Sequence, residues 1–545
     1  MLWQKESNKA NALYADLFAL SGGEARLKLM TRNLRAQTKP GQKPIKNDSI
    51  SLQKRKEGNE HFGQSRWVDA LELYNESICH AQPGSKNISL AYANRAACFL
   101  KMKRLDECLR DIELAKEAGY PAELMPKLDQ RKIDCLKEIK EGRSRSEHFR
   151  TKLDFEPNEK FPCMANVVDI ERDADGDYSV VAKADIDIGQ TIVVEKVFLV
   201  YLFELKAQKC NICLKGYTNL IPCEKCAIAM FCSDKCRHNP LHDYECGLVY
   251  STNSQLNGSL MNDVRGILLA INMFSTADEL EEFVEETIKS NPTCLPDSLS
   301  NQKSQYEAFL KLPINESMIS PDQMMCLTYE VYNQLLNMPK VDAFFRTKKL
   351  RRFLMHLVFY HIQILENNSV QGSVKLLSGM NQGRLVTCYN PTGLIEKYFR
   401  HSCAPNVVTA EGDGNHIFMT IRPIKKGDRL TFSCFMFLVE SKDKRQKILW
   451  ERRKMICSCT RCKGVAATSE ERRQFLFDPD FQSIVLTKLP LDHSNTEQIQ
   501  KVTDKCVNFL KKYDRTEWCD EIGAVVHIYI HLLLSNKPLT LPLSA

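Results

Sequence analysis

Small and apolar residues recur at helical spacing in two related segments between residues 49 and 140. The second segment repeats the first 38 positions later, through the pairs Gly58/Ala96, Phe62/Leu100, Trp67/Leu105, Ala70/Cys108 and Tyr74/Ile112. Small residues where paired helices cross, with large apolar ones between them, are what stacked helical hairpins require. A third stretch, residues 122–139, can cap the second hairpin. The pattern predicts a helical repeat domain over residues 49–140, behind a basic lead-in at residues 1–48.

Further along the chain, the period of the apolar residues changes from helical to strand-like and back. Alternation between residues 165 and 202 predicts three or four short strands, and alternation returns after Gly379. Helical periodicity fills residues 257–370 and resumes near residue 468. The predicted class is therefore a multidomain α+β protein. Its parts are β-rich halves at residues 151–209 and 379–440, a helical insertion at 247–378, a short segment at 441–466 and a helical C-terminal region at 467–545.

Eight residues that commonly bind metals follow the first β-rich half, within residues 210–246. Their order is Cys210-x2-Cys213-x9-Cys223-x2-Cys226-x5-Cys232-x3-Cys236-x5-His242-x3-Cys246. Close cysteine pairs, a pair one helical turn apart and a His/Cys pair make two tetrahedral zinc sites. A segment this short cannot bury enough apolar surface to fold alone. Metal binding is therefore expected to supply its folding free energy.

Composition and charge limit the cell compartments and the classes of partner that are expected for this protein. The formal net charge of +7 is mild for 545 residues, and the basic runs at 348–352 and 442–447 suit solvated helix faces, so nucleic acid is not expected as a partner. The longest apolar run, residues 353–365, is shorter than the roughly 20 residues of a membrane span, so no membrane partner is expected. The chain has 22 cysteines, and its first residues do not resemble a secretory signal. Together these features favour free thiols and zinc ligands over disulfides, and a location in the cytoplasm or nucleus.

The order of the eight ligands resembles that of the MYND zinc finger, in which two metal sites interleave. MYND modules bind short peptide segments of partner proteins, so the resemblance implies a protein-binding role. It also implies two ligand sets, one of Cys210, Cys213, Cys232 and Cys236 and the other of Cys223, Cys226, His242 and Cys246.

Three further segments extend the resemblance. They are DIDIGQTIVVEKVFLVY before the finger, RHSCAPNVV from Arg400, and IRPIKKGDRLTFSC followed by a Cys-x-Cys-x2-Cys cluster. With the finger and the repeats, they resemble the SET-and-MYND proteins, in the branch with an N-terminal tetratricopeptide domain. Members of that family are S-adenosylmethionine-dependent protein-lysine methyltransferases. The resemblance implies a third zinc ion on Cys403, Cys457, Cys459 and Cys462, with Cys434 as a less favoured partner than Cys403.

The expected cofactor segment departs from the family pattern. The family's asparagine before His-Ser-Cys is Arg400, and its early Gly-x-Gly is Asp177-Tyr178-Ser179. Cys434, or Phe435 with a shift of one residue, takes the place of the tyrosine that orients the amine. No catalytic residue is therefore assigned, although Tyr398 and Tyr389 are alternatives. The remaining similarity implies cofactor contacts from Asn381, Arg400, His401 and Asn406.

Two hypotheses follow from these departures. In the first, the protein is a lysine methyltransferase that uses a different hydroxyl group. In the second, it is a catalytically degenerate SET scaffold that binds chaperones or corepressors through zinc-dependent modules. An arginine brings positive charge near a cationic sulfonium, and a thiol orients an amine less well than a phenol does. The residues thus favour the scaffold, and the family favours the enzyme.

The repeats contain a candidate peptide site. Their offset is near the 34 residues of tetratricopeptide repeats. In such domains that hold the C-terminal carboxylate of chaperones, cations and asparagines line the groove, where they donate charge-assisted hydrogen bonds. The alternative is ordinary polarity of a solvated helix. The matching residues are Arg55, Asn59, Asn94, Lys127 and Arg131.

Overall fold

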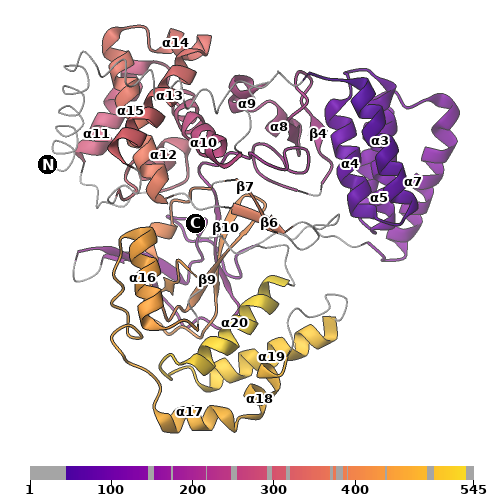
Figure 1. The fold of residues 1–545 in the computed structure, drawn as a ribbon. Coiled ribbons are helices and arrows are strands. Elements are labelled where there is room, and N and C mark those ends of the chain that lie inside the picture. The colour runs from indigo at the N-terminus through magenta and orange to yellow at the C-terminus, as the bar shows by residue number, and fades with distance from the viewer. Residues whose placement is uncertain are drawn as a thin grey trace.

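The protein is described by a computed structural model in which helical lobes surround a small group of strands (Figure 1). The described residues are 45–144, 152–172, 176–216, 218–246, 254–290, 298–314, 320–368, 372–375, 385–389, 391–435, 439–487 and 496–535. Most of the predicted lead-in and Asn381 lie outside them.

The predicted repeat region is helical throughout, apart from its turns. Its elements are α3 (Asp48–Gly63), α4 (Trp67–His80), α5 (Lys86–Lys101), α6 (Leu105–Glu117), η1 (Ala122–Leu124) and α7 (Met125–Lys140). α3 and α4 cross closely because Gly58 has no side chain: a Cβ there would lie 2.6 Å from Cε1 of Tyr74. Two helical hairpins and a following helix therefore form, with Ala70, Ala96 and Phe99 fully buried between them.

The cysteine-rich segment after residue 209 has little regular structure. Its elements are β4 (Ile221–Pro222), β5 (Met230–Phe231), α8 (Asp234–Arg237) and α9 (Pro240–Glu245). Its buried side chains, among them Leu220 and Phe231, belong to the same apolar cluster as those of the repeats. The finger segment and the repeats therefore share one core.

The two β-rich halves join in space. The first contributes β1 (Val168–Arg172), β2 (Tyr178–Ala182) and β3 (Thr191–Lys196). The second contributes β7 (Leu385–Tyr389), η2 (Glu396–Tyr398), β8 (Arg400–His401), β9 (Val407–Gly412), β10 (Asn415–Thr420) and β11 (Thr431–Phe432). The strand β6 (Gly372–Lys375) lies before the second half, in the range predicted to be helical, because it pairs with β7. β10 lies between β3 and β9 in one antiparallel sheet, while β8 and β11 pair in parallel. β1 pairs with β2, and β6 with β7. The pairing of β3 with β10 closes the split domain across more than two hundred residues of sequence.

Helices cover both sides of this strand region. The insertion forms α10 (Ser254–Ile271), α11 (Ala277–Lys289), α12 (Gln302–Leu310), α13 (Pro321–Leu336), α14 (Pro339–Phe344) and α15 (Lys348–Asn368), whose apolar faces share a core with β1, β2 and β3. After the strands come α16 (Lys442–Arg453), α17 (Ser469–Leu476), α18 (Pro479–Val485), α19 (Thr496–Lys512) and α20 (Asp520–Ser535). The last helices bury Trp518 and Val525 against Ile417 and Met419 of β10.

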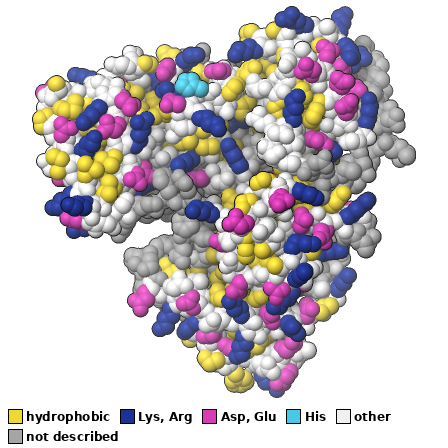
Figure 2. Space-filling model, turned by 180° about the vertical axis from the view of Figure 1, so that it is seen from behind, with side chains coloured by type: hydrophobic (Ala, Val, Ile, Leu, Met, Phe, Trp, Pro, Cys, Tyr) yellow, Lys and Arg dark blue, Asp and Glu magenta, His cyan; other side chains and the backbone are white. Residues whose placement is uncertain are grey.

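Two surface properties bear on partners. On the face shown in Figure 2, basic and acidic side chains are interspersed and do not form a field of one sign. None of the helices in the described ranges combines the length and apolarity that crossing a bilayer requires.

Candidate functional site

The eight ligand residues of the finger gather into two groups of four. Cys210, Cys213, Cys232 and Cys236 form one group, and Cys223, Cys226, His242 and Cys246 form the other, with ligand atoms within 4.8 Å of one another in each. Four sulfur atoms at about 2.3 Å from one zinc ion would be spaced by about 3.8 Å. The measured Sγ–Sγ distances are 3.8 Å for Cys232–Cys236 and 3.8 Å for Cys223–Cys246. Both groups can therefore hold zinc, and the grouping is the one that the MYND resemblance implies.

A third group joins distant parts of the chain. Cys403, just after β8, meets Cys457, Cys459 and Cys462, which follow α16. The Cys462–Cys403 Sγ distance is 3.6 Å, and Arg461 Nη1 donates to the Cys403 carbonyl at 3.0 Å. Cys434 is not a member of this group. The thiols form a third set that can bind zinc and that fastens the end of the strand domain to the His-Ser-Cys segment.

The His-Ser-Cys segment crosses the segment that contains Cys434. β8 and β11 run side by side in register, with Arg400 opposite Thr431 and His401 opposite Phe432. His401 Nδ1 accepts from the Cys434 backbone N–H at 3.1 Å. Burial lowers the pKa of His401 to about 4, so its imidazole is neutral and able to accept.

Asn406 has a similar task at the same crossing. Its Oδ1 accepts from the Thr431 backbone N–H at 2.7 Å, and its Nδ2 donates to the Arg429 carbonyl at 2.9 Å. Side-chain atoms of both Asn406 and His401 therefore form hydrogen bonds that hold the two crossing segments together. Their contact with a cofactor stays a prediction, and so does that of Asn381, which lies outside the described residues.

Two of the departures from the family pattern meet in space. Arg400 Nη2 lies 2.8 Å from Asp177 Oδ2, although 223 residues separate them in sequence. The side chains are 43% and 60% exposed, so the pair faces solvent. Next to Asp177, Ser179 is buried and its Oγ has no hydrogen-bond partner among the described residues. A matched pair of opposite charges thus occupies positions where the family has uncharged residues.

The place of the expected tyrosine offers no phenol. Cys434 is partly buried, and burial raises the pKa of its thiol to about 12, so it stays protonated near neutral pH. Phe435 is buried against the third cysteine group. Tyr398 in η2 is buried as well, and burial is the main cause that raises its pKa. Tyr389 lies in β7, and its side chain is outside the described part of the chain.

Comparison with known proteins agrees with this geometry. The SET domain family model matches residues 177–434. The protein-lysine N-methyltransferase SMYD4 of Mus musculus is 26% identical over 352 residues, which cover 50% of this chain and 43% of the relative. The chain contains a SET domain and is similar to the SET-and-MYND proteins. The SMYD4 of Danio rerio is 23% identical over 220 residues (35% of this chain, 28% of the relative), and a SET and MYND domain-containing protein of Dictyostelium discoideum is 36% identical over 67 residues (12% and 17%). The chain thus spans less than half the length of these curated relatives.

Four of the five predicted peptide-site residues lie around Tyr74. Asn59 Oδ1 accepts from the Tyr74 hydroxyl at 2.9 Å and from Asn94 Nδ2 at 2.8 Å. Arg55 and Arg131 lie near enough to lower the pKa of Tyr74, which burial raises more strongly. Arg55 Nε is buried and has no partner among the described residues. Lys127 is exposed one turn before Arg131 on α7.

A buried ion pair of the repeats, at their contact with the finger, was not predicted from the sequence. Arg95 is fully buried and holds Asp111 with two hydrogen bonds of 2.7 Å each. Its Nη1 also donates to Asn75 Oδ1 at 2.8 Å and to the Leu220 carbonyl of the finger at 2.9 Å. Asn219 Nδ2 adds a bond to Asp111 at 2.7 Å. An arginine on the small-residue face of a repeat helix, in the sequence ANRAA, was the available signal.

A second buried polar group lies within the β3–β10–β9 sheet. Glu195 Oε1 accepts from the backbone N–H groups of Leu394 at 2.6 Å and Ile395 at 3.1 Å. His416 Nε2 lies 3.5 Å from a carboxylate oxygen of buried Glu411. Burial raises the pKa of Glu195 to about 7. Only the alternating pattern of the strands hinted at inward-facing charges here.

Proposed function

We propose that this protein is an S-adenosylmethionine-dependent protein-lysine methyltransferase whose finger and repeats recruit protein partners, in the cytoplasm or nucleus. The match to the SET domain and the similarity to protein-lysine N-methyltransferases support the reaction class. The observation that carries cofactor binding is the Arg400–Asp177 ion pair. Its charges stand at two positions where the family resemblance places contacts to the amino-acid end of the cofactor.

The pair suits that end chemically. The amino-acid end of S-adenosylmethionine carries a carboxylate and an ammonium group. A guanidinium binds a carboxylate with two parallel hydrogen bonds, and a carboxylate accepts from an ammonium. An exposed ion pair contributes about 0–1 kcal/mol, so exchanging Arg400 and Asp177 contacts for contacts to a zwitterion costs little. The donor set therefore fits the cofactor, with Arg400 toward its carboxylate and Asp177 toward its ammonium.

Bound S-adenosylmethionine supplies a methyl group on a sulfonium sulfur. The chain has to hold a neutral lysine amine in line with that methyl group, so positioning provides most of the rate. The Cys434 thiol is a weak hydrogen-bond partner for this task. We assign the orienting role to the Tyr398 hydroxyl. Tyr398→Phe is then expected to lower methyl transfer while leaving cofactor affinity unchanged.

Calorimetric titration of the zinc-loaded full chain with S-adenosylmethionine tests the proposal. The charge swap Arg400→Asp with Asp177→Arg keeps an ion pair but reverses its two ends, and at least a tenfold loss of affinity is expected. The matched control exchanges Lys183 and Glu171, which form an exposed ion pair at the paired strands β1 and β2. This control variant is expected to bind the cofactor like the wild type. No cofactor binding by the wild type, or equal binding by both swaps, would refute the assignment.

The second candidate function is a scaffold without turnover, favoured by Cys434 and by the residues around Tyr74. Arg55 Nε is a buried donor for which the described residues offer no partner, and such donors are rare unless a ligand or water completes them. The probe is a peptide with an acidic C-terminus, such as those of chaperones, in free and amidated forms. The free carboxylate is expected to bind and the amide to bind weakly.

A charge reversal separates this clamp from general attraction. Lys127→Glu with Arg131→Glu is expected to abolish peptide binding, whereas Lys137→Glu with Lys140→Glu changes exposed lysines of the same helix and is expected to leave it intact. Thermal unfolding checks that Arg131, which donates to the Ala93 carbonyl, is not needed for folding. Peptide binding without cofactor binding would select the scaffold.

A further inference from the structure

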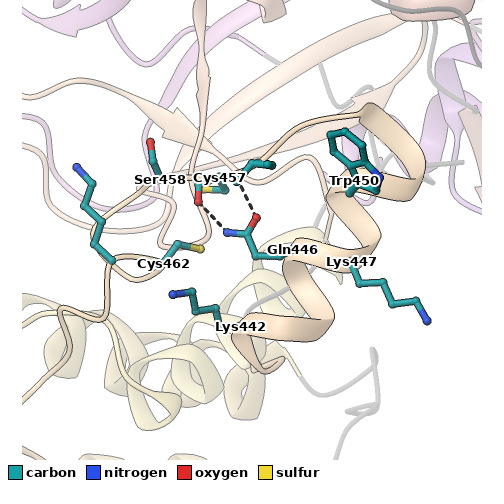
Figure 3. Close-up of a pocket in the computed structure, with 9 residues that line it drawn as sticks. Lys442, Gln446, Lys447, Trp450, Cys457, Ser458 and Cys462 are labelled. Carbon is teal, nitrogen blue, oxygen red and sulfur yellow. Dashed lines mark hydrogen bonds between the residues drawn. The ribbon is translucent and has the colours of Figure 1, made fainter.

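An open hollow of about 580 Å³ lies between α16 and the loop that carries the third cysteine group. Figure 3 shows its floor, where Gln446 is joined to Cys457 by two hydrogen bonds. Gln446 Nε2 donates to the Cys457 carbonyl at 2.7 Å, and the Cys457 N–H donates to Gln446 Oε1 at 3.1 Å. Because Cys457 also belongs to a metal-binding group, the floor is held from both sides. The hollow is thus formed before any ligand arrives, which reduces the cost of binding.

Its walls expose two large apolar side chains. Trp450, one turn beyond Gln446 on α16, is 51% exposed, and Ile456 is 75% exposed. None of the described residues covers them. An exposed apolar surface beside a fixed cavity is typical of interaction sites, and tryptophan is enriched among the residues that dominate binding energy.

The rim of the hollow is basic. Lys442 and Lys463 are exposed and make no side-chain hydrogen bond or ion pair with other described residues. Lys447 reaches only Glu451, at 3.9 Å. An occupant therefore has to combine negative charge for these ammonium groups with an apolar group for Trp450 and Ile456.

We infer that this hollow binds an acidic peptide segment that carries one bulky apolar side chain. The apolar side chain packs between Trp450 and Ile456, while flanking Asp or Glu residues pair with Lys442 and Lys463. Single-stranded nucleic acid fits less well because it needs free aromatic faces for base stacking. Here one ring is present, Lys454 Nζ already lies 5.5 Å from its centre, and the opposite wall is aliphatic. The proposed peptide binding does not require methyl transfer.

Fluorescence anisotropy with the zinc-loaded full chain tests the inference. The probe is a labelled peptide of alternating Asp and Glu around a central Phe; its analogues replace Phe by Ser or every acidic residue by its amide. Wild-type protein is expected to bind the probe at least tenfold more tightly than either analogue. Equal binding of the Ser analogue, equal binding of the amide analogue, or no binding of the probe would overturn it.

Variants locate the site. Trp450→Ala and the pair Lys442→Glu with Lys463→Glu are each expected to weaken binding at least tenfold. The control pair Lys348→Glu with Lys501→Glu makes the same change of net charge at exposed positions elsewhere and is expected to bind normally. Equal losses in both pairs would reduce the effect to net charge and overturn the site. Tighter, Trp450-dependent binding of an oligothymidine would overturn the peptide in favour of nucleic acid.

Discussion

Replacing Arg95 by methionine should destabilise the contact between the repeats and the finger. Arg95 is fully buried and joins α4, α5 and α6 to the Leu220 carbonyl. Asp111 stabilises the charged form of Arg95. Burial by itself would lower the pKa of Arg95, but the adjacent carboxylate raises it. Without Arg95, the buried carboxylate of Asp111 keeps, among the described residues, only the Asn219 amide as a side-chain partner.

The expected loss follows from this geometry. Removing one partner of a buried, hydrogen-bonded ion pair costs about 3–5 kcal/mol. At about 1.4 kcal/mol for each factor of ten, amide hydrogens of α4 to α6 should exchange roughly two to nearly four orders of magnitude faster. Hydrogen–deuterium exchange of the full chain measures this locally, without requiring that the whole protein unfold in one step. Zinc release to a chromophoric chelator, measured on the same samples, should also become faster.

The control is a neighbouring arginine on the surface. Arg110→Met removes an ion pair with Glu117 whose side chains are 51% and 62% exposed, and the loss should stay below about 1 kcal/mol. The double variant Arg95→Met with Asp111→Leu should recover part of the stability because no buried charge remains. Exchange in Arg95→Met that matches the Arg110→Met control would refute the reasoning.

Further predictions concern metal content and the buried polar group of the sheet. Metal analysis should find three zinc ions per chain, and two in Cys403→Ser, because one missing ligand breaks a structural site. Gly393→Ala should destabilise the sheet in thermal unfolding, since its Cβ would lie 2.6 Å from His416 Nδ1; the open helical position Gly63→Ala should not. Burial raises the pKa of Glu195 to about 7 from its ordinary 4.5, so its contribution to stability is present below pH 4.5 and lost as the pH rises through 7. Melting temperatures of Glu195→Gln should therefore fall less than those of the wild type between pH 5 and 7.

What the sequence predicts well here is chemistry that local spacing determines. The ligand order from Cys210 to Cys246 resembles that of the MYND finger, this resemblance implies two sets of four ligands, and the structure gathers the same two sets. The helical hairpins follow in the same way from small residues such as Gly58, because α3 and α4 can approach each other this closely only where no side chain lies between them. In both cases, residues close in sequence determine the outcome.

What the sequence does not reveal depends on distant residues. Considered one at a time in the sequence, Arg400 and Asp177 are two departures from the family pattern. Folding brings their side chains within 2.8 Å and makes them an ion pair. Arg95 looks like a solvated repeat residue until the finger covers it. Likewise, Asn406 resembles a cofactor ligand, yet its amide completes the backbone hydrogen bonds of Arg429 and Thr431. Partner choice at long range cannot be read from local periodicity.

The core shared by the repeats and the finger affects how the protein can be dissected. A fragment ending near residue 144 would expose the apolar side chains that Leu220 and Phe231 cover, together with the unmatched end of Arg95. Such a fragment would bind other proteins nonspecifically, and proteins retained on it could be mistaken for physiological ligands. Mapping of partners is better done with point substitutions in the intact chain, because truncation creates a surface that the cell never presents.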